Sequence, residues 1–187
     1  MQYTMNQYKL VWRSNINLKE KVNKMNAVVW NRGRWSLHLF PLSPTLTRTI
    51  DGAQARYLRR ILKVPAAFIS RVSHKEIRRR CSTYRFSTFI FRSQLNWLGH
   101  ILRKPPTDPL RLVLFQPNTD LEPRRPPTND RVTKAVRGRP NLDWGQELLR
   151  RIHRLSGKTR REVAQLAQDR RLFHQFIERL CSLADQR

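Results

Sequence analysis

Apolar residues recur at spacings of three and four in the stretch that follows Ser43-Pro44. This stripe consists of Leu46, Ile50, Ala53, Tyr57, Leu58, Ile61 and Leu62. Such a period is typical of an amphipathic helix with one buried face, so we predict a helix over residues 46–62. Pro65 lacks a backbone N–H and ends that helix.

A second stripe of the same period lies further along the chain. It consists of Phe91, Leu95, Leu98 and Leu102, with Ile90, Trp97 and Ile101 beside it. We predict a helix from Ser87 to Arg103. Pro105-Pro106 ends it, because the residue before a proline is disfavoured in the helical conformation.

Two segments have the Ser/Thr-x-x-Glu spacing of a capping box, in which the first side chain and the glutamate each satisfy a backbone N–H at a helix start. Ser73 with Glu76 predicts a short basic helix through residues 78–80. Thr159 with Glu162 predicts the start of a second helix near the C-terminus.

The last part of the chain has two further helical stripes. Asn141 is suited to cap the first, and Gly157 to end it in a left-handed conformation. That stripe consists of Trp144, Leu148, Ile152 and Leu155. The stripe after Thr159 consists of Val163, Leu166, Ala167, Phe173, Phe176, Ile177 and Leu180.

Two regions show no sustained period. Residues 1–44 are rich in asparagine, which disfavours long helices, and we predict that this segment is poorly ordered. Residues 105–141 hold eight of the eleven prolines, which indicates a linker or extended arm. Within that arm, residues 112–115 are apolar and suit a short strand.

The elements together predict a mainly α fold. We expect a small basic helical bundle, residues 45–104, joined by the Pro-rich arm, residues 105–141, to a second helical region, residues 142–187.

Net charge narrows the choice of partner. The chain has 38 Lys and Arg against 13 Asp and Glu, a formal charge of +25, and residues 46–104 alone hold 14 basic and 2 acidic side chains. Such an excess is self-repelling in a compact state unless an anion neutralises it, so nucleic acid is the expected partner. No apolar run approaches the roughly 20 residues of a membrane-spanning helix. The first 30 residues lack a signal-peptide core, so we expect an intracellular protein with no membrane partner.

The sequence offers little that could perform catalysis. Its six glycines are scattered singly, so no phosphate-binding loop is evident, and its carboxylates are not gathered as metal-assisted phosphoryl transfer requires. Cys81 and Cys181 are too far apart for a zinc site, and we expect reduced thiols. Cys81 with His74 or His100 is a conceivable catalytic pair, but nothing in the spacing selects it. We therefore expect no catalytic residue, no metal and no cofactor.

The candidate phosphate contacts are basic residues with almost no acidic residues beside them in the sequence, which a simple solvated face would mix in. They are Arg56, Arg59, Arg60, Arg78, Arg79, Arg80, Arg103 and Lys104. His100 follows Trp97 by three residues, so it can stack on that indole. It is either a partly buried histidine at a helix end or a contact to phosphate or base.

Arg137-Gly138-Arg139-Pro140 is similar to the core of an AT-hook, in which glycine lets the backbone enter a minor groove and two arginines extend along it. A tight turn before the helix that Asn141 caps explains the same residues.

Taken in order, five short segments resemble the region downstream of the reverse transcriptase palm in LINE-type (non-LTR) retrotransposon polyproteins. The resemblance spans about residues 35–177, and the block Leu95 to Arg103 is its most specific part. The segments are Trp35-Ser36-Leu37, Leu58-Arg59-Arg60-Ile61-Leu62, Leu95-Asn96-Trp97-Leu98-Gly99-His100-Ile101-Leu102-Arg103, Arg137-Gly138-Arg139-Pro140 with Trp144, and Ala167-Gln168-Asp169-Arg170.

The resemblance implies a role in holding nucleic acid. In that family this region follows the polymerase and holds template RNA and the primer duplex, while other domains carry the chemistry. The Tyr-x-Asp-Asp motif of the polymerase is missing here, so we expect a non-enzymatic fragment or truncated copy that binds RNA or RNA–DNA hybrid, and is nuclear if functional. The alternative is an independent DNA-binding protein that uses the AT-hook-like arm.

Overall fold

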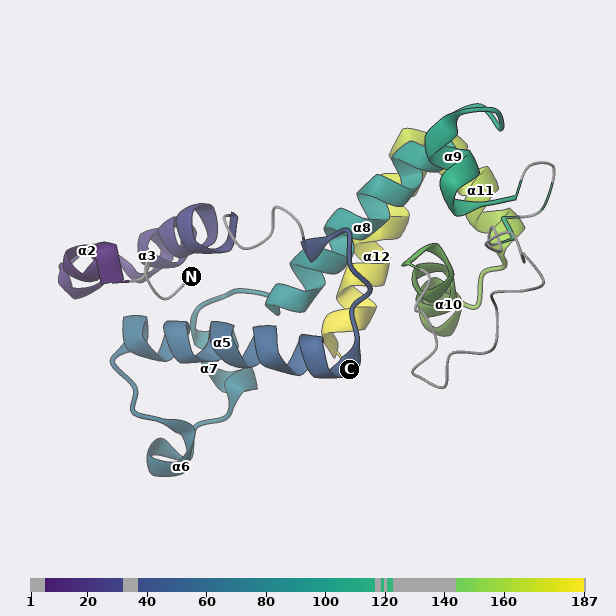
Figure 1. The fold of residues 1–187 in the computed structure, drawn as a ribbon. Coiled ribbons are helices and arrows are strands. Elements are labelled where there is room, and N and C mark those ends of the chain that lie inside the picture. The colour runs from purple at the N-terminus through teal and green to yellow at the C-terminus, as the bar shows by residue number, and fades with distance from the viewer. Residues whose placement is uncertain (1–5, 32–36, 117–118, 120, 123–143, 187) are drawn as a thin grey trace, which may run out of the picture. The chain divides into compact units, whose positions relative to one another are not determined.

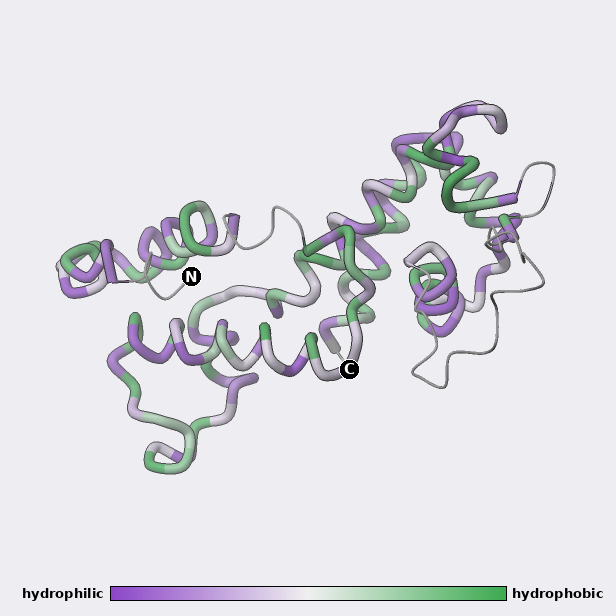
Figure 2. Tube along the Cα trace, in the orientation of Figure 1, coloured by the Kyte–Doolittle hydropathy of each residue, from purple (hydrophilic) through white to green (hydrophobic). Residues whose placement is uncertain are grey.

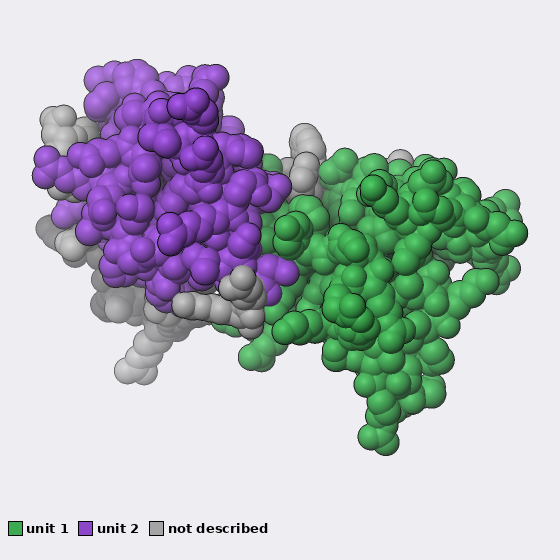
Figure 3. Space-filling model, turned by 180° about the vertical axis from the view of Figure 1, so that it is seen from behind, with its two compact units in different colours: residues 1–91 green, residues 92–187 purple. Residues whose placement is uncertain are grey.

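The computed structural model describes residues 6–31, 37–116, 119, 121–122 and 144–186, and these residues are mainly helical, as predicted. They form two compact units, residues 1–91 and residues 92–187, which are coloured separately in Figure 3. The first unit contains α2 (Lys9–Arg13), α3 (Leu18–Lys24), the π-helix η1 (Met25–Trp30), α5 (Pro44–Leu62), α6 (Ala67–Ser70), α7 (His74–Arg80) and the start of α8 (Phe86–Leu102). The second contains the rest of α8, α9 (Pro109–Leu114), α10 (Trp144–Ser156), α11 (Arg160–Gln168) and α12 (Arg170–Gln186) (Figure 1).

Helix α5 forms where the hydrophobic period predicted it. The Ser43 hydroxyl accepts a hydrogen bond from the backbone N–H of Leu46 at 3.2 Å, and Pro44 occupies the first turn, where a missing N–H is harmless. Apolar and polar residues recur along the helix with the helical period (Figure 2). Lys63 ends it in the left-handed conformation, with φ 55°.

The prediction of a poorly ordered N-terminal segment is wrong for residues 9–30. Asn17 does not break a helix but starts α3, because its side chain accepts a hydrogen bond from the N–H of Lys19 at 2.7 Å. The helices bury their apolar residues in one core with α5 and α8. From the N-terminal helices that core receives Trp12, Val22, Met25, Val29 and Trp30.

Side chains of α5 hold the start of α8. The carboxylate of Asp51 accepts hydrogen bonds from the N–H of Ser87 at 2.9 Å and from its hydroxyl at 2.8 Å. Gln54, fully buried, accepts from the N–H of Phe86 at 2.9 Å and donates to the carbonyl of Tyr84 at 2.8 Å. These bonds satisfy N–H groups that a helix start leaves without intrahelical partners.

The boundary between the two units falls inside α8 rather than in the Pro-rich arm, which corrects the predicted division. Residues 92–104 belong with the C-terminal helices. Arg103 donates a hydrogen bond to the carbonyl of Ala167 at 3.1 Å, and Gln168 donates to the carbonyl of Leu102 at 3.1 Å. Arg92 also forms an ion pair with Glu178 on α12.

The C-terminal elements follow the predicted signals with two differences. Gly157 has φ 72° and ends α10, and Thr159 with Glu162 forms the complete capping box. The apolar stripe after Thr159 is divided into α11 and α12 at Asp169, whose carboxylate accepts from two N–H groups of the first turn of α12. The proposed strand at residues 112–115 is wrong, because Asp108 and Pro109 start helix α9 there.

Gly99 on α8 packs against Phe173 on α12. A Cβ at this position would lie 2.4 Å from Cε1 and 2.7 Å from Cδ1 of Phe173, which is 2 % exposed. Gly52, on α5, would meet nothing within 4 Å. The glycine of the Leu-Gly-His block is therefore required by packing.

We expect Gly99→Ala to destabilise the protein by about 1–3 kcal/mol, the typical cost of overpacking a core. Gly52→Ala is the matched control, because it also adds one methyl group inside a helix. It should stabilise by about 0.5–1 kcal/mol, since alanine is the better helix former. Urea unfolding followed by circular dichroism measures both, and equal stability of the two variants would contradict the packing argument.

Candidate nucleic-acid interface

The arginines predicted on α5 divide between solvent and core. Arg56 and Arg60 are exposed, and the guanidinium of Arg60 lies 6.0 Å from the ring centroid of Tyr57. Arg59 is only 5 % exposed. The prediction that all three contact phosphate is therefore wrong for Arg59, whose side chain points into its own unit.

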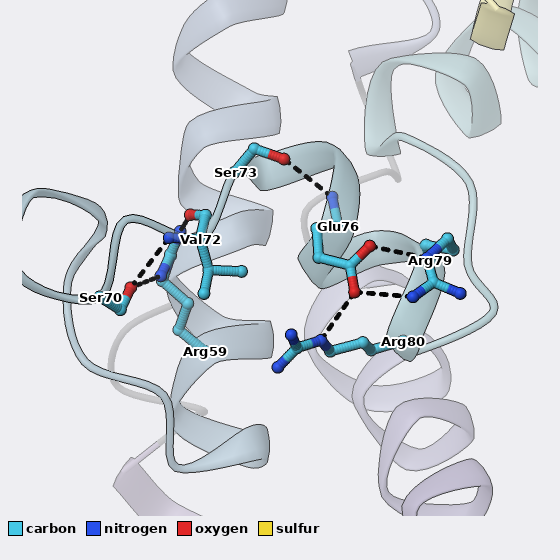
Figure 4. Close-up of polar contacts among 7 residues, drawn as sticks. All are labelled: Arg59, Ser70, Val72, Ser73, Glu76, Arg79 and Arg80. Atoms are coloured by element: carbon cyan, nitrogen blue, oxygen red, sulfur yellow. Dashed lines mark hydrogen bonds and ion pairs between the residues drawn. The ribbon is translucent and has the colours of Figure 1, made fainter.

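Arg59 holds the loop that contains α6. Its guanidinium donates to the hydroxyl of Ser70 at 3.0 Å and to the carbonyl of Val72 (Figure 4). It also donates to the carbonyl of Pro65 at 2.8 Å. A guanidinium presents several N–H donors in a fixed plane, so one side chain satisfies three acceptors at once. Arg59 is a structural residue of this loop.

Helix α7 carries its own counter-ion. The Ser73 hydroxyl accepts from the N–H of Glu76 at 3.1 Å, as the capping-box spacing predicted. The Glu76 carboxylate instead accepts from Arg79 at 2.6 and 2.8 Å and from Arg80 at 2.9 Å (Figure 4). Together these hydrogen bonds lower the pKa of Glu76 to about 2, and those from Arg79 make the largest contribution. Two of the three arginines in this cluster are thus paired within the helix.

The third arginine of α7, Arg78, is half-buried beside His74. Partial burial lowers the pKa of His74, and the positive charges of Arg59 and Arg78 lower it further. The imidazole therefore favours its neutral form, and the positive charge on this side of α7 comes from arginine.

Trp97 and His100 stack on each other, as their spacing predicted. Their ring centroids lie 5.7 Å apart with an interplanar angle of 24°. The tryptophan is half-buried and the histidine is exposed. His100 is thus at the surface of the second unit, next to the buried Gly99.

The two basic residues at the end of α8 are engaged within the second unit. Arg103 donates to the carbonyl of Ala167, and burial together with the charge of Arg170 lowers its pKa. Lys104 Nζ lies 3.5 Å from the carboxylate of Asp108. Their predicted role as phosphate contacts is therefore weakened, most of all for Arg103. The Arg137-Gly138-Arg139-Pro140 segment lies outside the described residues.

The second unit contains a basic pocket that the sequence interpretation missed. It has a volume of about 480 Å³ and lies between α10 and the start of α11. The cations of its lining are Arg150, Arg154, Lys158 and Arg160, and Glu147 is its acidic residue. Glu147 Oε1 lies 2.9 Å from Arg154, and Glu147 Oε2 lies 3.7 Å from Arg150. In the sequence, the four-residue spacing of Arg150 and Arg154 indicates that these two lie on one face of a helix. Only the fold brings Lys158 and Arg160 to the same pocket.

A histidine also lines this pocket. Its Nδ1 lies 3.1 Å from the carbonyl oxygen of Lys158, which selects the tautomer protonated on Nδ1. The backbone of the loop between α10 and α11 therefore fixes the ring of His153. The pocket combines four cations with an oriented imidazole, and such a lining suits an anion.

The structure also places the thiols and the possible metal ligands of the described residues. Both cysteines are buried and free, and burial raises the pKa of Cys81 to about 11, so its thiol is protonated at neutral pH. No group of three or more His, Cys, Asp or Glu side chains is placed to hold a metal ion in the part of the chain that the structure describes. Within the same ranges, no helix has both the length and the apolar character to cross a membrane.

Comparisons of this chain with known protein families, with curated proteins and with solved structures find no match.

We expect Arg59→Ala to destabilise the first unit by about 2–3 kcal/mol, because hydrogen bonds to a charged group are lost and part-buried carbonyls lose their donor. Arg60→Ala, one residue further on the exposed face, should change stability by less than about 0.5 kcal/mol. Thermal and urea unfolding measure both. A destabilisation by Arg60→Ala as large as that of Arg59→Ala would contradict the assignment.

Glu76 should titrate near pH 2 instead of near its usual 4.5, because the carboxylate form is hydrogen-bonded to Arg79 and Arg80. A pKa lowered in the folded state adds stability above pH 4.5, and this stability is lost as the pH falls toward 2. Wild type should therefore exceed Glu76→Gln in stability at pH 6, and the two should converge near pH 2. Carboxyl-carbon NMR gives the midpoint directly, and a midpoint near 4.5 would contradict the paired geometry.

Proposed function

We propose that this chain is a nucleic-acid-binding region of a LINE-like reverse transcriptase, which holds template RNA or the primer duplex and performs no polymerase chemistry itself. The resemblance of the Leu95 to Arg103 block and its neighbouring segments motivates the family. Such a region works inside the cell, and in the nucleus where the element integrates.

The observation that carries the proposal is the surplus of positive charge. The chain has almost three cations for every carboxylate, and its formal charge is +25. Several described carboxylates are already used as caps or ion-pair partners, including Asp51, Glu76, Glu147 and Asp169. The exposed Arg56 and Arg60 lie on α5, whose acidic residue, Asp51, caps α8. A polyanion supplies the missing negative charge and gains free energy by releasing its counter-ions.

The basic pocket between α10 and α11 is the strongest candidate for a phosphate contact in the second unit. Arginine presents paired N–H groups that match a phosphate, and the pocket offers three arginines with one lysine. A phosphate would compete with Glu147 for Arg150 and Arg154 without breaking a buried contact, since both arginines are exposed. Contacts of this kind position nucleic acid without reading its sequence.

The alternative, an independent DNA-binding protein, rests on Arg137-Gly138-Arg139-Pro140. The two proposals predict different nucleic-acid preferences. A region that holds a primer duplex should bind RNA–DNA hybrid or structured RNA at least as tightly as A·T-rich DNA. An AT-hook protein should prefer A·T tracts and lose that preference in Arg139→Ala.

Fluorescence anisotropy with labelled hybrid, hairpin RNA and A·T-rich duplex tests this proposal over a range of salt concentrations. We expect the logarithm of the affinity to fall with the logarithm of salt, with about 0.9 in slope for each phosphate contacted on B-form DNA. Arg150→Ala combined with Arg154→Ala should lower the slope by up to about 1.8 on that scale. An affinity that does not change with salt would overturn the proposal.

The matched control is Arg161→Ala combined with Arg171→Ala. Both arginines are exposed in the same unit, and neither lines the pocket. The control removes the same charge, so it should lower the slope by less than half as much. An equal effect of the two double variants would show that the pocket is not a preferred contact. A preference for A·T-rich duplex that Arg139→Ala abolishes would support the alternative.

A further inference from the structure

A second pocket, in the first unit, has a different character. Its volume is about 330 Å³. Three aromatic rings and three side-chain amides line it: Trp30, Phe86, Phe89, Asn23, Asn26 and Asn31. None of these residues carries a charge, in a chain of which 27 % is charged.

Two buried polar atoms of this lining have no hydrogen-bond partner among the described residues. One is a donor, the indole Nε1–H of Trp30, a side chain that is 3 % exposed. The other is an acceptor, Oδ1 of Asn26. A buried polar group without a partner costs about 1–3 kcal/mol, so most folded proteins avoid it. Both atoms are buried, and both belong to residues that line the pocket.

The backbone explains how these two side chains come to share the wall. Asn26 and Trp30 both belong to η1, the π-helix over Met25–Trp30. A π-helix is rare and frequently occurs at functional sites. Trp30 also packs on Phe86, with ring centroids 4.1 Å apart, which fixes the indole. Aromatic packing therefore holds the indole of Trp30 in place.

We propose that this pocket binds an unpaired nucleobase of single-stranded nucleic acid. A base is planar and uncharged, and its edge carries both donors and acceptors, which complements a lining of aromatic rings and side-chain amides. Unstacked bases are recognised on aromatic side chains and through hydrogen bonds to their edges in this manner. The ligand is a base rather than a phosphate because the lining has no cation. This inference rests on the proposed function, since the basic surface must first hold the strand.

The test compares two oligomers of equal length and charge, a mixed-sequence RNA and an abasic phosphodiester, by fluorescence anisotropy with the full chain. We expect the RNA to bind about 5- to 150-fold more tightly, the range that stacking of one base supports. Equal binding of the two would overturn the base pocket and leave the proposed function intact. Binding of neither at low salt would overturn the proposed function itself.

Asn26→Ala tests whether this pocket causes the preference for RNA over the abasic oligomer. The variant removes an unsatisfied buried acceptor, so its stability should equal or exceed that of wild type, while most of the preference for the RNA is lost. Phe89→Ala, at the half-buried part of the lining, is a second variant that does not change η1. Phe68→Ala is the matched control, because Phe68 is 80 % exposed on α6 and does not line the pocket. An unchanged preference in both pocket variants, or the same loss in Phe68→Ala, would overturn the assignment.

Discussion

The chain has 13 Asp and Glu against 38 Lys and Arg, and helix starts in the described part of the fold depend on a few of these carboxylates. Asp51 on α5 holds the start of α8, Asp169 starts α12, and Glu162 completes the capping box of α11. Each of these carboxylates accepts from backbone N–H groups at a helix N-terminus, the end at which the helix dipole favours a negative charge. Glu162 caps a helix and also lies 3.6 Å from Nζ of Lys158, so one carboxylate can serve both purposes. The surplus of basic residues is set by the composition, 38 Lys and Arg against 13 Asp and Glu.

Several lysine and arginine side chains donate to backbone carbonyl oxygens, which the C-terminal end of a helix leaves without intrahelical partners. Lys21 is 7 % exposed and donates to the carbonyls of Trp12 and Ser14 at the end of α2, and Arg111 donates to the carbonyls of Leu102 and Lys104 at the end of α8. Arg59 and Arg103 likewise bind carbonyl oxygens. A run of arginines in the sequence is therefore not equivalent to a charged surface, because backbone carbonyls take some of them out of solvent.

Local signals predicted local structure well. The period of three and four gave α5 and α8, Gly157 ended α10, and Thr159 with Glu162 began α11, because each depends on residues that are neighbours along the chain. Contacts between distant residues could not be predicted in this way. The stripe on α8 does not indicate that its second half packs with the C-terminal helices. The ion pairs of Glu76 are local, by contrast, because Arg79 and Arg80 follow it by three and four residues, a spacing that allows such pairs as well as a capping box. The asparagines of the N-terminal segment were interpreted as helix breakers, although Asn17 caps one.

Both pockets illustrate why a site is harder to predict than a helix. The basic pocket combines Arg150 and Arg154 with Lys158 and Arg160 from across a turn, and the aromatic pocket combines η1 with the start of α8. The two linings are chemically opposite, since one is cationic and the other is neutral, with aromatic rings and side-chain amides. A nucleic acid strand also has two chemically opposite parts, its phosphates and its bases. If each pocket takes the part that matches it, affinity would come mainly from the cations, and discrimination between base-bearing and bare backbone would come from Trp30 and Asn26.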